Sequence, residues 1–136
     1  RLASFSPELD EDQSARASEL LETLAQSGLE TPDREELEKT FSTEILEYLI
    51  RQDEIVQLSE DRLISTETYQ NAVQTVRSYL KEHQPAPLKD LRDALDSSRK
   101  YVIPLMEYLD QEGITIRDGD VRHLRNEPAA SDGEEQ

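Results

Sequence analysis

The alternation of apolar and polar positions is most regular in residues 97–125. Tyr101, Val102, Leu105, Met106 and Leu109 recur at spacings of one, three and four residues. Such spacing is typical of an α-helix, in which residues three and four apart lie on the same face. The sequence therefore predicts a helix here with a wide apolar face.

Capping and turn residues indicate where this helix begins and ends. Ser98 is a favourable N-cap, because its hydroxyl can accept a hydrogen bond from a free N–H of the first turn. Gly113 suits the C′ position, where the backbone is left-handed. Two predicted strands, at 114–117 and 121–125, flank Asp118-Gly119, a dipeptide typical of a two-residue hairpin turn. Helix, glycine stop and hairpin predict the second half of a winged helix-turn-helix.

Similar elements are predicted earlier in the chain. Thr31, which precedes Pro32, and Ser42 are expected to cap the second and third helices. The other predicted elements are a helix at 10–26, strands at 55–58 and 62–64, and helices at 66–83 and 88–95.

An internal repeat divides the chain. The tripeptide Glu-Tyr-Leu at 47–49 returns at 107–109, 60 residues later, each time before a predicted hairpin. We therefore expect a mainly α fold with small β wings, built as two tandem winged-helix domains at 1–65 and 66–125. Residues 126–136 contain no large apolar side chain and are expected to form a disordered acidic tail, and roughly the first five residues are expected to be mobile.

The net charge of −16 argues against nucleic-acid binding when the chain is taken as a whole. Its distribution changes this picture. Residues 1–65 carry 6 Lys or Arg and 17 Asp or Glu, whereas residues 66–125 carry 9 and 10. The cations of the second domain gather at the helix start and the hairpin. We therefore expect the second domain to bind an anion, and the acidic first domain to be a spacer or to face a protein.

Two cations stand at the first helical positions of the stretch. Arg99 and Lys100 follow Ser98 directly, where free N–H groups and the positive end of the helix dipole favour a phosphate. Pro104 lies further inside the helix and cannot donate to the carbonyl of Lys100, so we expect a kink that turns the first turn outward. A solvated helix start is the alternative interpretation.

Other residues of the second domain could also contact RNA, but the sequence leaves a structural role open for several of them. With Asp118-Gly119 as the turn, Arg117 and Arg122 are expected to share the outward face of the hairpin, where both could contact phosphate, and His123 the inner face. Arg92 could bind RNA or form an ion pair with Asp96. Arg125 ends the second strand, where a structural role and a binding role are both open. Tyr101 could stack on a base or pack in the core.

The stretch resembles SelB, the bacterial selenocysteine-specific translation elongation factor. The resemblance rests on the Ser-Arg-Lys-Tyr start at 98–101, the proline inside the helix, the Glu-Tyr-Leu-Asp run at 107–110 and the Gly-Asp pair of the hairpin. It covers residues 88–125 closely and residues 5–80 more weakly, and it does not extend to the tail.

The resemblance implies a cytoplasmic, monomeric module that binds the selenocysteine-insertion (SECIS) hairpin of messenger RNA. Its partners would include the ribosome and selenocysteinyl-tRNA through the full-length protein, whose GTPase body uses GTP and Mg²⁺. It implies RNA contacts from a set of residues that share cationic, polar or aromatic character. These residues are Arg92, Ser98, Arg99, Lys100, Tyr101, Arg122 and Arg125.

The sequence offers little to other classes of function. It contains no Cys and only two, separate His residues, so no metal site is expected, and no cofactor is expected in this chain. The GxxxxGK[ST] motif that binds nucleotide phosphates is absent, and no carboxylate pair is set apart for acid–base catalysis, so we expect no enzyme. No stretch is long enough to span a membrane. The alternatives are a DNA-binding regulator of winged-helix type and a protein-binding winged helix.

Overall fold

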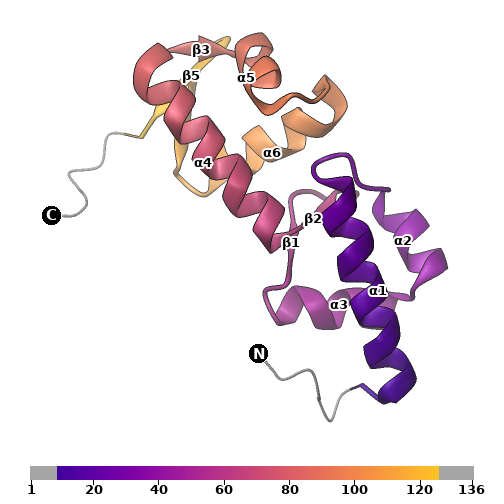
Figure 1. Cartoon of the computed structure of the whole chain (residues 1–136). Helices are drawn as coiled ribbons and strands as arrows, with labels where there is room; N and C mark the ends of the chain where they lie inside the picture. Colours follow the sequence, from indigo (N-terminus) through magenta and orange to yellow (C-terminus); the bar gives the residue numbers. More distant parts are fainter. Residues whose placement is uncertain (1–8, 126–136) are drawn as a thin grey trace, which may run out of the picture. The chain divides into compact units, whose positions relative to one another are not determined.

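The computed structural model describes residues 9–125, so the expected mobile ends, residues 1–5 and 126–136, lie outside the described residues. Short helices and shorter strands make up this range (Figure 1). In order they are α1 (Glu11–Ser27), α2 (Arg34–Thr40), α3 (Thr43–Arg51), β1 (Ile55–Gln57), β2 (Leu63–Ser65), α4 (Thr66–His83), β3 (Ala86–Pro87), α5 (Leu88–Leu95), α6 (Arg99–Gln111), β4 (Thr115–Asp118) and β5 (Val121–Leu124).

The chain divides into two compact units, Arg1–Ala72 (unit 1) and Val73–Gln136 (unit 2). The boundary falls inside α4, which begins in unit 1 and ends in unit 2. Each unit contains helices followed by an antiparallel hairpin. The mainly α fold with small β wings is therefore confirmed.

Unit 1 forms around α1, which contacts α3 and β2. Asp10 caps α1 in a capping box with Gln13, and Gly28 ends the helix with a φ of 62°. Strands β1 and β2 pair antiparallel, with Val56 opposite Ile64. The apolar faces of these elements form one core, whose buried members are Leu9, Ala17, Leu20, Leu24, Leu37, Ile45, Leu46, Leu49, Ile55 and Leu63.

The second helix of unit 1 begins later than predicted. Asp33, and not Thr31, is the N-cap of α2, and its carboxylate accepts a hydrogen bond from the N–H of Glu36. Thr31 is buried and donates its hydroxyl to the carbonyl of Leu63 at 2.7 Å. A threonine can either cap a helix or donate to a neighbouring strand. Thr31 does the second, because Leu63 of β2 lies beside it.

Unit 2 contains the remainder of α4, then α5 and α6, and a sheet of order β3-β5-β4. Ser65 caps α4 as predicted, since its hydroxyl accepts from the N–H of Thr68. Pro104 lies inside α6. The buried apolar side chains of this unit come from all three helices and from β3, and are Val73, Val76, Leu80, Ala86, Leu91, Val102, Leu105, Met106 and Leu109.

The hairpin of unit 2 differs from the prediction in two respects. Its turn is Gly119-Asp120, one residue later than expected, so that Arg117 opposes Arg122 and Ile116 opposes His123. A third strand, β3, pairs with the open edge of β5, with Ala86 opposite Arg122. The sequence did not predict this strand, because a segment of two residues, Ala86 and Pro87, is too short to show an alternating pattern and contains a proline.

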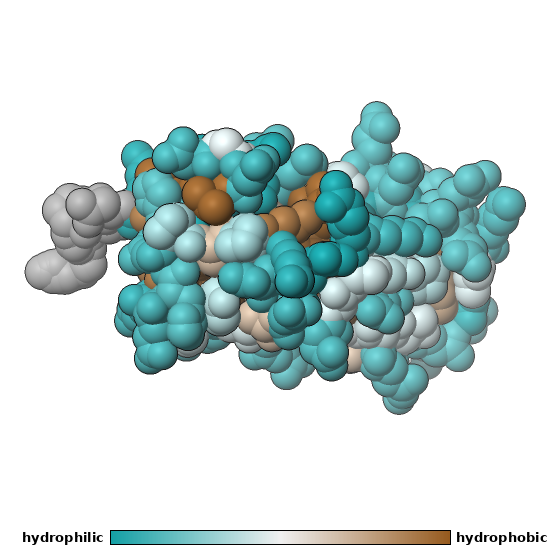
Figure 2. All heavy atoms as spheres, turned by 90° about the horizontal axis from the view of Figure 1, so that it is seen from above, coloured by the Kyte–Doolittle hydropathy of each residue, from teal (hydrophilic) through white to brown (hydrophobic). Residues whose placement is uncertain are grey.

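Hydrophilic residues cover most of the face in Figure 2, and hydrophobic residues show only in small areas among them. Among the described residues, Ile116 is the large hydrophobic side chain that stands most exposed, at 40%. None of the helices described here is both long and apolar enough to cross a membrane.

Candidate nucleic-acid interface

The first turn of α6 presents two exposed cations. Ser98 occupies the N-cap position with an extended backbone, as predicted, but its side chain makes no cap hydrogen bond. Arg99 and Lys100 follow it and are both exposed. The turn contains no acidic residue, and cations at a helix N-terminus oppose the dipole at a cost of a few tenths of a kcal/mol. A bound anion would remove that cost.

A groove of about 360 Å³ lies between α6 and the hairpin of unit 2. Arg99, Ile103 and Glu107, spaced by four residues, line it from α6, and Arg117 lines it from β4. Its other lining residues are Leu88, Gly119, Asp120 and Arg122. The groove thus has one exposed arginine on each side and an apolar contribution from Leu88 and Ile103. Such a surface can neutralise phosphates that run between helix and hairpin.

The structure corrects the expectation for Arg122. Arg122 and Arg117 do share one face of the hairpin, but that face turns toward α6 and not outward. The guanidinium of Arg122 is only 6% exposed and binds the carboxylate of Asp110, with Nη2 at 2.8 Å from Oδ2. Its charge is therefore paired within the protein. His123 lies with Ile116 on the opposite, outer face, because the hairpin packs against α6 by the face that carries Arg117 and Arg122.

Arg117 takes the place on the hairpin that Arg122 was expected to fill. It is exposed, and its Nε donates to the carbonyl of Gly119 at 3.0 Å, which holds the side chain close to the turn. Arg99 forms no ion pair or hydrogen bond through its side chain within residues 9–125. Arg99 and Arg117 are thus the two groove cations with charge not paired to a carboxylate.

Lys100 and Tyr101 stand beside the groove. The Lys100 ammonium lies 5.4 Å from the centroid of the Tyr101 ring, a cation–π distance. Tyr101 is half-buried. A base that stacked on this ring would have to share it with Lys100, so the two residues are coupled in any RNA contact. Both roles remain predictions.

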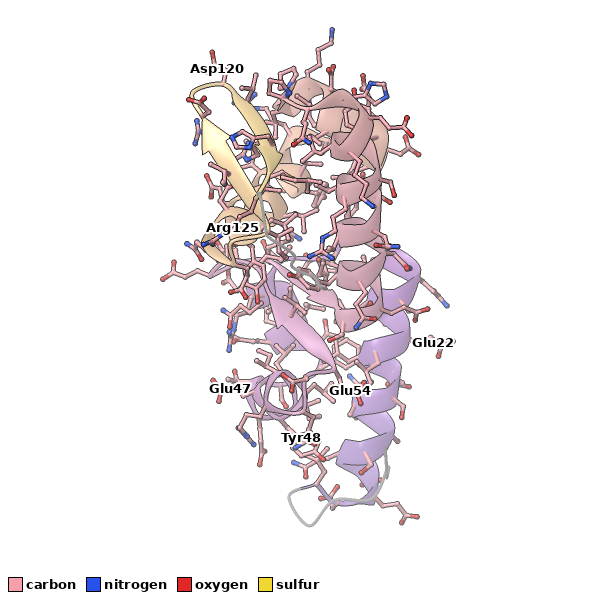
Figure 3. The ribbon with its side chains drawn as sticks, turned by 90° about the vertical axis from the view of Figure 1, so that its left-hand side faces the viewer. Glu22, Glu47, Tyr48, Glu54, Asp120 and Arg125 are labelled. Atoms are coloured by element: carbon pink, nitrogen blue, oxygen red, sulfur yellow. The ribbon has the colours of Figure 1, made fainter. Side chains whose placement is uncertain are left out.

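Arg92 and Arg125 do not line the groove. Arg92 is half-buried on α5 with its Nε unpartnered among the described residues, and the ion pair with Asp96, the alternative to RNA contact, is not formed in that range. Arg125 lies against the opposite end of α6, since a Cβ at Gly113 would come within 2.6 Å of its Nη1. Figure 3 shows Asp120 at the turn of the hairpin and Arg125 at its other end.

The separation of Arg125 from Arg99 is considerable. The 13 residues of α6 extend about 20 Å, with Arg99 at one end and Arg125 at the other. One compact contact cannot include both, although a longer RNA could reach each.

Sequence reasoning missed Ile103, Glu107 and Asp120 as members of the groove. The spacing of Arg99, Ile103 and Glu107 by four residues was a usable signal, because such residues share one helix face. The hairpin face that they meet depends on how the hairpin packs against α6, which no local sequence pattern indicates.

Three helices and a three-stranded antiparallel sheet define unit 2 as a winged helix. A family model described as "Elongation factor SelB, winged helix" matches residues 78–124. Over these residues unit 2 is therefore similar to the winged helix of the SelB family.

Similar proteins extend this likeness to nearly the whole chain. A selenocysteine-specific elongation factor from Desulfomicrobium baculatum is 30% identical over 131 residues, which are 92% of this chain and 21% of that protein. The chain thus spans about a fifth of the length of this relative. The crystal structure of bacterial selenocysteine-specific elongation factor EF-Sec matches with a TM-score of 0.71 and 25% identity over 88% of this chain and 20% of that one.

The mRNA-binding domain of elongation factor SelB from E. coli, solved in complex with SECIS RNA, is also similar. It matches with a TM-score of 0.69 and 25% identity, over 87% of this chain and all of that domain. The likeness therefore includes both units in their order along the chain.

Proposed function

We propose that this chain is the mRNA-binding part of a selenocysteine-specific elongation factor, and that unit 2 binds an RNA hairpin through its groove. The observation that carries the proposal is the pair of Arg99 and Arg117 on opposite sides of the groove between α6 and the hairpin. In addition, 87% of the chain matches the whole of the E. coli domain that was solved with SECIS RNA.

The chemistry of the groove favours RNA backbone and loop over duplex DNA. After Lys100, the charged side chains of α6 are both acidic. Glu107 is exposed, and Asp110 binds Arg122 of the hairpin. A helix that reads base edges in the major groove of DNA needs donors along that surface. The deep groove of an RNA helix is too narrow for a helix to enter, so contacts to phosphates near a loop and to unpaired bases fit better.

The proposal assigns the remaining steps to other parts of a longer protein. A GTPase body with GTP and Mg²⁺ would deliver selenocysteinyl-tRNA on the ribosome at a UGA codon, while this chain, as a cytoplasmic monomer, holds the hairpin. Such a body is consistent with the small share of the Desulfomicrobium baculatum relative that this chain covers, 21%.

The test uses the whole 136-residue chain and a pool of RNA hairpins with one stem and a randomised loop. Hairpins retained on the immobilised chain are sequenced and their affinity is measured by fluorescence anisotropy. We expect enriched loops that bind more tightly than the unselected pool, the loopless stem and the DNA hairpin of the same sequence.

The competing classes give different results. Equal affinity for every loop and for heparin would indicate non-specific polyanion binding and contradict the proposal. Preference for a DNA duplex would indicate the regulator class, and absence of binding to any nucleic acid would favour a protein-facing winged helix.

A further inference from the structure

One carboxylate joins the third helix of unit 2 to both strands of its hairpin. Asp110, in the last turn of α6, accepts hydrogen bonds from Arg122 on β5, with Nε at 3.1 Å from each oxygen and Nη2 at 2.8 Å from Oδ2. It also accepts from the Thr115 hydroxyl on β4 at 2.6 Å. The contact is charge-assisted and involves two donors of the guanidinium, a geometry that fixes direction as well as distance.

The three residues are largely removed from solvent. Thr115 is 2% exposed, Arg122 is 6% exposed, and the Asp110 side chain is 22% exposed. Arg122 lies on the central strand of the sheet and directly opposite Arg117 on β4. The position of Arg117 on the groove therefore depends on a strand pair that Asp110 holds against α6.

Electrostatic interactions do not explain why an aspartate stands at position 110. An anion near the C-terminus of a helix is disfavoured by the dipole. Paired with Arg122, it also cancels a cation at the very groove that we propose binds phosphate. The first effect costs helix stability and the second weakens anion binding, so the residue has to contribute something other than charge if the groove binds RNA.

We propose that Asp110 is a positioning residue for RNA binding, which sets the separation between Arg99 on α6 and Arg117 on the hairpin. The inference rests on the proposed function of the groove and names a determinant of its specificity. A phosphate or loop that must meet both arginines is selected by their spacing, and a hairpin free to move would lose that selection.

The replacement Asp110→Asn separates positioning from charge, because the two predict opposite signs. The amide removes one negative charge beside the groove and leaves Arg122 uncompensated, so charge alone predicts tighter binding of every polyanion. Positioning predicts weaker binding of a selected hairpin, while the affinity for heparin stays equal or rises. The measured quantity is the ratio of affinities for the selected hairpin and the unselected pool.

We expect this ratio to fall about tenfold in Asp110→Asn, as for residues coupled within one hydrogen-bond network. Asp118→Asn is the matched control, because it removes the same charge from an exposed hairpin residue on the face away from Arg122. That control should leave the ratio unchanged. An unchanged ratio in folded Asp110→Asn, or a rise in both affinities, would overturn the inference.

Coupling to Arg117 gives a readout that a general loss of stability would not produce. If Asp110 acts through Arg117, then Asp110→Asn should change the ratio little further in a chain that already carries Arg117→Ala. Additive losses in the two variants would show that Asp110 acts otherwise.

A second variant covers the case in which Asp110→Asn fails to keep a native helical spectrum. Arg122→Lys keeps the charge but cannot bind the carboxylate with two donors of a planar fork. It should lower the ratio at constant net charge, and an unchanged ratio would again contradict the inference. Should the wild-type chain select no hairpin at all, the proposed function fails, whereas a selective wild type with an unaffected variant defeats this inference alone.

Discussion

The third helices of the two units end alike and begin differently. Three buried residues of α3 have buried counterparts in α6 at a constant distance of 60 residues, namely Ile45 and Leu105, Leu46 and Met106, and Leu49 and Leu109. The two helices also end 60 residues apart, at Arg51 and Gln111. The packing of the helix against the rest of its unit is therefore repeated.

The beginning of the helix is not repeated. α3 has 9 residues and α6 has 13, so α6 starts four residues earlier in this alignment. Four residues add about one turn, or about 6 Å. This additional turn carries Arg99 and Lys100, whereas α3 begins with Thr43 and Glu44 at the same positions after the N-cap.

The cations of the two units also differ in their partners. In unit 1, Arg34 binds Glu38 and Glu47 at 2.7 and 3.5 Å, and Lys39 lies 3.9 Å from Glu35. Arg16 binds Glu19 and lies 4.6 Å from the centroid of the Phe41 ring, and Arg62 donates to the carbonyl of Thr31. These side chains serve the structure of unit 1. In unit 2 the exposed Arg99 and Arg117 are not paired with carboxylates.

The difference teaches that net charge is a poor guide to the partner of this chain. The same helical core carries an acidic residue in the first turn of α3 and two cations in the first turn of α6. What separates the two units is one helical turn, and the lack of an ion pair for Arg99 and Arg117 among the described residues although Glu107 and Asp120 also line the groove. In Figure 3, Glu47 and Tyr48 mark α3 of unit 1, where Arg34 is paired with Glu47.

The largest expected effect comes from giving α6 the first turn of α3. The variant Arg99→Thr with Lys100→Glu should lose at least about 20-fold in affinity for a selected hairpin near 0.15 M salt, since two phosphate contacts are lost. The slope of log K against log salt should become shallower by about 1.5 to 2 units. Anisotropy titrations at several salt concentrations measure both.

A reciprocal exchange provides the control for total charge. Adding Thr43→Arg and Glu44→Lys to that variant restores the net charge of −16. Hairpin affinity should stay low, because the cations then stand on the wrong helix. Recovery of wild-type affinity would mean that net charge, and not the first turn of α6, controls binding.

The free energy of unfolding should depend on the buried Arg62 and not on the exposed Arg99. Arg62→Ala removes the donor to a buried Thr31 carbonyl and should lower the free energy of unfolding by about 1–3 kcal/mol. Arg99→Ala should change it little. Urea unfolding followed by far-UV circular dichroism makes the comparison, and equal stability of both variants would contradict the structural role given to Arg62.

A smaller effect is expected from the hairpin side of the groove. Arg117→Ala should weaken hairpin binding about fivefold near 0.15 M salt and make the salt slope shallower by about one unit, as for one lost phosphate contact. Arg77→Ala, at an exposed position of α4, is the matched control. Equal losses in the two variants would indicate diffuse attraction and not a contact in the groove.

The smallest effect is expected when unit 1 alone receives the cations of unit 2. Thr43→Arg with Glu44→Lys should raise non-specific affinity for heparin slightly and leave the ratio between selected and unselected hairpins unchanged. The additional turn is missing there, and the facing hairpin offers only Arg62, which is committed to Thr31. A selective second site in this variant would break the comparison of the two units.

The sequence by itself determined the helices of this protein and their order. Periodic apolar residues fixed α6, α4 and α5, because a face that must be buried leaves a signal every three to four residues. The position of Arg99 and Lys100 at the start of α6 followed from Ser98, and the resemblance to SelB followed from the same short stretch. All of these depend on residues close to one another along the chain.

Only the tertiary structure decided the hairpin and the partners of its arginines. The turn lies one residue later than expected, at Gly119-Asp120, which moves each residue's partner by two positions and so leaves Arg117 and Arg122 on one face. Which of the two faces packs against α6 is a matter of tertiary structure, and it is the face of Arg122. The packing of that face against α6 places Arg122 at the carboxylate of Asp110 and Arg117 on the groove. Thr31 and β3 were misjudged for the same reason, since their roles depend on strands that lie far away in the sequence.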